Sequence, residues 1–112
     1  MNDKTGTYKT ELMLAQCGIN GCAFEYYKCA ARIASEDPES LNQIIKYIYY
    51  PMSVHFCQTI SYIERTMRES AAQLYFGAPE LFEQKGNDYI GGRPTVSEVL
   101  GMLIDFEYSD NY

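Results

Sequence analysis

The sequence has no tryptophan, a single histidine and no uninterrupted apolar run of about 18 residues, the length that a membrane-spanning helix needs. It also has no stretch with the basic start, apolar centre and small-residue cleavage site of a signal peptide. We therefore expect a cytoplasmic protein. Of its 112 residues, 46% are apolar and 21% are charged, which is typical of a folded globular protein. This length predicts a single domain over residues 1–112.

Motifs for catalysis or cofactor binding are also lacking. The adjacent Gly91 and Gly92 have neither the spaced glycines nor the lysine of a phosphate-binding loop. His55 and Cys57 are two residues apart, so on a helix they would point to different sides and would not share a zinc ion. A cysteine–histidine dyad is a further possibility, but no catalytic family signature accompanies it. We therefore predict a protein that is not an enzyme and holds no metal or cofactor.

The chain has four cysteines, and an even number is also typical of proteins that are held together by disulfide bonds. In a chain with enough apolar residues for a core and in a reducing compartment, such cysteines are more often buried thiols. We expect buried, unpaired thiols at all four positions: Cys17, Cys22, Cys29 and Cys57.

Positive charge is scarce in the last third of the chain. Residues 1–79 contain eight acidic and seven basic residues, whereas residues 80–112 contain seven acidic and two basic residues. The formal net charge of −6 therefore comes mostly from the C-terminal third. Binding to the phosphates of DNA or RNA requires a basic surface, so this composition predicts no direct contact with nucleic acid.

A long helical pattern runs through the middle of the chain. Large apolar residues recur every three or four positions from Leu41 to Leu74, which places them on one face of an α-helix. Pro51 lies inside this pattern and lacks a backbone donor, so we expect the helix to be kinked or broken there. The expected segments are 38–50 and 51–76.

Opposite charges stand four residues apart in the second of these segments. Glu64 is followed by Arg68, and Arg65 is followed by Glu69. Such pairs stabilise the exposed face of a helix, so we interpret this surface as solvated and not as a site.

Shorter patterns flank the long helix. Residues 7–35 also have helical spacing, with a break expected near residues 18–21 because glycine destabilises a helix interior. Thr95, followed three residues later by Glu98, forms a capping box that predicts the start of a final helix. Together these elements predict an all-α, compact bundle of four to five helices around the long central helix.

The remaining segments are expected to be short or irregular. Residues 1–6 carry no pattern and should fray, residues 80–84 could add one helical turn, and the glycine-containing residues 85–94 should form a loop. The final segment, residues 105–112, interleaves acidic and aromatic side chains and is expected to be an exposed tail.

Eleven tyrosines and the acidic tail favour a role in binding proteins, because tyrosine is enriched at interfaces and acidic side chains complement a basic surface. In size and charge the chain resembles small acidic inhibitors from phages and mobile elements, including anti-CRISPR proteins. The leading hypothesis is a phage-type inhibitor that mimics nucleic acid and blocks a basic host protein. Its predicted contact residues are Asp105, Phe106, Glu107, Tyr108, Asp110, Tyr49, Tyr50 and Tyr62.

Two further possibilities stay open at this point. The apolar stripe within residues 38–76 is long enough to pair with a second copy of the chain in a homodimer. Alternatively, protomers of a small helical oligomer could hold a nucleotide between them, with tyrosines stacking and basic side chains meeting the phosphates. The residues predicted for this alternative are Tyr26, Lys28, Arg32 and Lys46.

Overall fold

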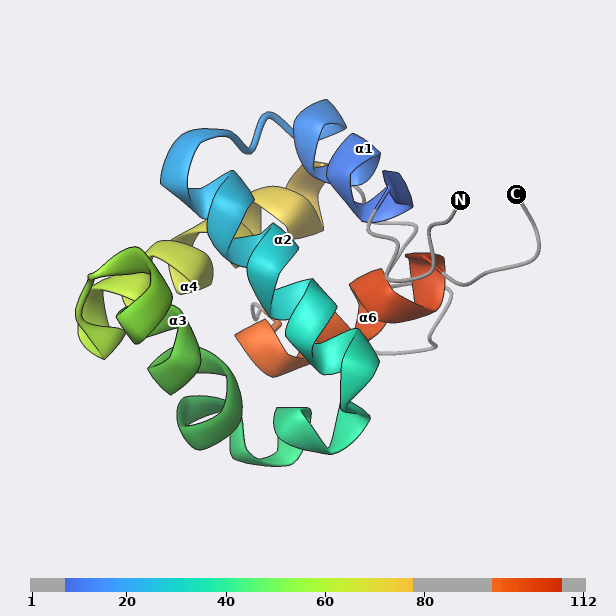
Figure 1. The fold of residues 1–112 in the computed structure, drawn as a ribbon. Helices are drawn as coiled ribbons and strands as arrows, with labels where there is room; N and C mark the ends of the chain where they lie inside the picture. Colours follow the sequence, from blue (N-terminus) through green and yellow to red (C-terminus); the bar gives the residue numbers. More distant parts are fainter. Residues whose placement is uncertain (1–7, 78–93, 108–112) are drawn as a thin grey trace.

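The computed structural model describes residues 8–77 and 94–107, and all regular structure within these ranges is helical (Figure 1). The all-α class and the compact arrangement are confirmed. Within these ranges there are seven helical elements, five of them α-helices of seven residues or more, against the four to five helices expected. In chain order the elements are α1 (Tyr8–Gln16), α2 (Gly21–Glu36), the 3₁₀-helix η1 (Pro38–Gln43), the π-helix η2 (Ile45–Tyr49), α3 (Tyr50–Phe56), α4 (Ile60–Gly77) and α6 (Val96–Glu107).

The expected interruption of the first helical pattern separates α1 from α2. Gly18 has a φ of +79° and Gly21 has a φ of +63°, values that glycine adopts without the steric cost that a side chain would add. Between them the amide of Ile19 donates a hydrogen bond to the carbonyl of Leu14 at 2.9 Å, and the Ile19 side chain is buried. The two glycines therefore let the chain turn while an apolar residue from the turn fills the core.

The segment predicted as one α-helix over residues 38–50 is divided into a 3₁₀-helix and a π-helix. Pro38 begins η1, at the expected start of this segment. Asp37 precedes it, and its side chain makes no capping hydrogen bond. In the π-helical turn the amide of Tyr50 donates to the carbonyl of Ile45, five residues back. Pro51 follows directly and has no amide hydrogen, so the wider turn comes immediately before the residue that cannot donate.

The main break of the predicted long helix does not lie at Pro51. The backbone stays helical through Pro51, which occupies the first turn of α3, and the chain leaves the helix at Cys57. The segment expected as a helix over residues 51–76 is therefore two helices, α3 and α4, separated by residues 57–59. The periodic spacing continues across this break, which explains why the sequence pattern did not reveal it.

Helix α2 lies at the centre of the fold and contacts α1, α3, α4, α6, η1 and η2 (Figure 1). Five residues on its inward face are buried in the core: Tyr26, Tyr27, Ala30, Ala31 and Ala34.

The capping box at the start of α6 is confirmed: the Thr95 amide donates to Glu98 Oε1 at 2.9 Å, and the Glu98 amide donates to Thr95 Oγ1 at 3.1 Å. The fully buried side chains around α2 include Leu14, Ile48, Met52, Ile63, Met67, Leu74, Val99, Leu100 and Leu103.

The apolar stripe of residues 38–76 thus faces the interior of the monomer. Met52, Ile63 and Met67 are completely buried against other helices of the same chain. These three residues are therefore not available to a second copy, whereas Ile45 and Val54 of the same segment are 61% and 63% exposed. Pairing of two copies through this segment stays a prediction. The expected turn at residues 80–84, most of the loop at 85–94 and the fraying of residues 1–6 lie outside the described residues.

A buried hydrogen bond joins α2 to α4. The hydroxyl of Tyr27, whose side chain is completely buried, donates to the carbonyl of Met67 at 2.5 Å. Burial raises the pKa of Tyr27, so this hydroxyl stays protonated and remains a donor.

We expect Tyr27→Phe to lower the free energy of unfolding by about 1 kcal/mol, because it removes this hydrogen bond and leaves the ring in place. Urea denaturation followed by circular dichroism measures the change. Tyr50→Phe is the matched control, since Tyr50 is 59% exposed, and it should change stability by less than about 0.5 kcal/mol. Equal effects of the two substitutions would contradict a specific role for the Tyr27 hydroxyl.

Candidate nucleic-acid interface

Helices α3 and α4 and the three residues between them form a helix–turn–helix unit. Cys57 has a φ of +56° and a ψ of +45°, a left-handed conformation that ends α3. Its amide and the amide of Gln58 both donate to the carbonyl of Ser53, the latter at 3.2 Å, so the left-handed residue closes the last turn of the helix. The turn is therefore a hydrogen-bonded element with a fixed shape.

Thr59 begins the second helix of this unit. Its hydroxyl accepts a hydrogen bond from the amide of Tyr62 at 3.0 Å, and its carbonyl accepts from the amide of Ile63 at 3.1 Å. The side chain thus acts as an N-cap, the role that threonine often fills at this position. On the other side of the turn Phe56 packs edge-to-face against Tyr26 of α2, with ring centroids 4.9 Å apart.

Helix α4 presents two different faces. One face packs into the core through five buried residues: Ile63, Met67, Ser70, Ala71 and Leu74. The other face, in the first half of the helix, exposes polar side chains to solvent, among them Ser61, Tyr62, Arg65 and Arg68. Burial of the inner face against α2 fixes which side chains point outward.

The outward side chains surround a shallow polar depression of 530 Å³ on the surface. It is formed by the turn and the first half of α4, and the residues that line it are Gln58, Thr59, Ser61, Tyr62, Glu64, Arg65 and Arg68. Within it the Arg68 guanidinium bonds to the Glu64 carboxylate one helical turn earlier, as the sequence predicted. This bond contributes to raising the pKa of Arg68, together with the charge of Glu64.

Two of the tyrosines predicted as contact residues differ sharply in exposure. Tyr49 is buried, at 3% exposure, so its ring is part of the core and is not an available contact. Tyr50, at 59%, and Tyr62, at 38%, are exposed and remain candidates. Burial, assisted by the charge of Glu64 and opposed by Arg68, raises the pKa of Tyr49 to about 12.

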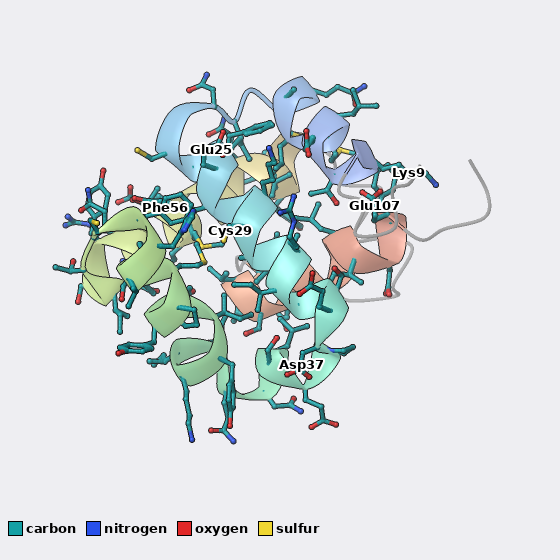
Figure 2. The ribbon with its side chains drawn as sticks, in the orientation of Figure 1. Lys9, Glu25, Cys29, Asp37, Phe56 and Glu107 are labelled. Atoms are coloured by element: carbon teal, nitrogen blue, oxygen red, sulfur yellow. The ribbon has the colours of Figure 1, made fainter. Side chains whose placement is uncertain are left out.

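The acidic-aromatic residues near the C-terminus belong largely to the fold. Glu107 Oε1 accepts a hydrogen bond from the amide of Thr10 at 2.8 Å, so this carboxylate caps the first turn of α1 (Figure 2). Phe106 is half-buried against the core, and Asp105 is exposed on the last turn of α6. Tyr108 and Asp110 lie outside the described residues. An exposed tail beginning at residue 105 is therefore wrong for residues 105–107, which are helical.

The residues predicted for a nucleotide site are not brought together in one cavity. Tyr26 is buried, and Lys28 lies 4.0 Å from Glu11 in an ion pair. Arg32 and Lys46 are exposed on different elements. The two larger described cavities, of 640 Å³ and 710 Å³, are not lined by any of the three basic residues.

The cysteines are more accessible than expected. Cys22 and Cys57 are exposed, Cys17 and Cys29 are partly buried, and all four are free thiols. The expected burial is therefore wrong for Cys22, which lies in the exposed first turn of α2, and for Cys57, which lies in the turn after α3. Within residues 8–77 and 94–107, no three histidine, cysteine or carboxylate side chains come together as a metal site would require.

None of the described helices is both long and apolar enough to span a membrane. Comparison of the chain with known proteins finds no matching family model, no similar curated protein and no similar solved structure.

The sequence pattern alone predicts that the exposed surface of α4 is solvated and is not a site. The signal that would have drawn attention to it is the turn at Cys57, and the sequence does not mark that turn.

We expect Cys57→Gly to raise the free energy of unfolding by about 0.5–1 kcal/mol, because glycine adopts a left-handed φ without a side-chain penalty. Cys57→Val should lower it, since a β-branched residue is strained at positive φ. Chemical denaturation of the two variants measures both changes. In the matched control Cys22→Gly, the same replacement in a right-handed helical turn should be destabilising. A loss of stability in Cys57→Gly would argue against the left-handed turn.

The buried Tyr49 also predicts a pH dependence. In the unfolded chain a tyrosine ionises near pH 10, whereas the folded pKa of Tyr49 is raised to about 12. The unfolded state therefore releases its proton first, and the free energy of unfolding should fall as the pH rises from about 10 to about 12. Tyr49→Phe should reduce this fall by up to about 1.4 kcal/mol per pH unit in urea titrations. Identical slopes in the two proteins would contradict this assignment.

Proposed function

We propose that this protein binds duplex DNA, with the first half of α4 entering the major groove. The observation that carries the proposal is the helix–turn–helix unit formed by α3, residues 57–59 and α4. In proteins that use this motif the second helix lies in the major groove and its N-terminal residues contact the edges of the bases. Here the corresponding residues of α4 are exposed and polar.

The outward side chains have the chemistry that reading a base sequence requires. Gln58 and Arg65 can each make paired hydrogen bonds, glutamine with adenine and arginine with guanine. Ser61 and Tyr62 lie between them on the same side of the helix and supply hydroxyl groups, which contact phosphates or bases. Arg65 is exposed, whereas Arg68 is bonded to Glu64. We therefore assign the main base contact to Arg65.

The sequence predicts no direct contact with nucleic acid, and the helix–turn–helix unit, not the charge, is the reason to propose DNA binding. Residues 8–77, which form the helix–turn–helix unit and α2, contain seven acidic and six basic residues. The acidic residues described in the C-terminal third lie on α6, and Glu107 among them is bonded to α1. Because this part of the chain is nearly neutral, the proposed binding gains little from attraction to phosphate and relies on contacts with the bases.

Inhibition of a basic host protein by an acidic surface stays a prediction. Of the five C-terminal residues proposed for it, Asp105 is exposed, while Phe106 and Glu107 pack within the fold. The homodimer and the nucleotide site also stay predictions.

The test of DNA binding begins by selecting preferred duplexes from a random library with the purified protein. Fluorescence anisotropy then compares the selected duplex with a scrambled one. We expect Arg65→Ala to weaken binding to the selected duplex about tenfold or more and to relax the preference at one base pair. The matched control is Arg32→Ala, which removes the same charge from the exposed surface of α2 and should change affinity less than about twofold.

Two results would contradict DNA binding through α4. The first is a selection that enriches no sequence, together with no anisotropy change at low ionic strength. The second is an equal loss of affinity in Arg65→Ala and Arg32→Ala, because only overall charge would then matter.

A further inference from the structure

An open surface pocket of 710 Å³, called the cavity below, lies where the turn between α1 and α2 meets the end of α3. Its walls include four apolar or aromatic side chains from the α1–α2 turn, α2 and α3: Ile19, Phe24, Tyr26 and Phe56. A volume of this size is within the range of cavities that hold small organic molecules. Gln58 lies at the border between this pocket and the proposed DNA-binding surface, and the other residues of the two linings differ.

Aromatic rings give the cavity a definite shape. Tyr26 and Phe56 meet edge-to-face, with their planes at 65°, so the wall is made of two rings held at an angle to each other. Tyr26 is also packed against Tyr62, with ring centroids 6.4 Å apart, which holds it from the other side. Aromatic surfaces of this kind attract both apolar groups and cations.

One charged residue lines the cavity, and it is acidic. Glu25 of α2 lies at its edge, on the same side of the molecule as Phe56 (Figure 2). Within the described parts of the chain no lysine or arginine forms an ion pair with Glu25. Lys28, three residues later on α2, is paired with Glu11 of α1. The cavity therefore combines an apolar aromatic wall with an uncompensated negative charge.

We propose that this cavity binds a small organic ammonium ion that has an aromatic or aliphatic body. The body fills the apolar space beside the half-buried rings of Phe24 and Phe56, with the buried Tyr26 ring behind them, and the ammonium group lies against the Glu25 carboxylate. An anionic molecule of the same size meets the same apolar wall but is repelled by Glu25. Charge complementarity thus selects cations over anions and over neutral molecules.

Cys22 provides a reporter for occupation of the cavity. It lies in the cavity lining and its residue is exposed, so a bound molecule should shield its thiol from iodoacetamide. Cys57 is also exposed but does not line the cavity, so its alkylation is an internal control in the same sample. Peptide mass spectrometry measures the two alkylation rates separately, with no DNA present.

The probe is 2-phenylethylammonium, compared with the anion 3-phenylpropionate. We expect the cation, at concentrations on the order of millimolar, to slow alkylation of Cys22 at least about fivefold while the rate at Cys57 stays unchanged. Glu25→Gln should weaken this protection about threefold. The matched control is Glu36→Gln, which removes an exposed carboxylate at the other end of α2 and should leave the protection unchanged.

Three outcomes would overturn the proposal. They are no protection of Cys22 by the cation, equal protection by the cation and the anion, and equal slowing at Cys22 and Cys57. Because the measurement contains no DNA, its result is separate from the success or failure of the proposed DNA binding.

Discussion

The left-handed backbone at Cys57 is the constraint on which the arrangement of the helices depends. Without it, the apolar pattern from Leu41 to Leu74 would continue in one direction as a helix far longer than the fold can cover. With it, α3 and α4 are separate, and both place their apolar faces on the same core around α2. The same turn projects the first half of α4 outward, so one backbone conformation determines both the core and the exposed polar surface.

Helix α2 then makes that surface rigid. Ile63, Met67 and Leu74 are completely buried, and burying each side chain of this kind stabilises a fold by about 1.5–3 kcal/mol. The hydrogen bond from Tyr27 to the Met67 carbonyl fixes α4 against α2 at a position opposite the exposed arginines. Packing of Phe56 on Tyr26 holds the turn from the other end. The proposed contact with DNA would depend on such a fixed support, because small displacements weaken paired hydrogen bonds.

The features that the sequence could predict are those with a local cause. The capping box of Thr95 and Glu98 needs only residues three apart, and the break at Gly18 and Gly21 needs only glycine. The division at Cys57 could not be predicted, since cysteine has no preference for positive φ and the apolar spacing stays in phase across the turn. Glu107 looked like part of a free acidic tail because its partner, the Thr10 amide, lies 97 positions away in the sequence. The candidate interface was missed for the same reason, as it exists only once the turn is known.

The most direct measurement is an NMR titration of the ¹⁵N-labelled protein with a duplex selected from a random library. If α4 enters the major groove, the largest shifts should occur at the amides of residues 58–68, with smaller ones in α3 and little change at the end of α6. If the largest shifts map instead to residues 105–107, or if no shifts occur at low ionic strength, DNA binding through α4 is contradicted.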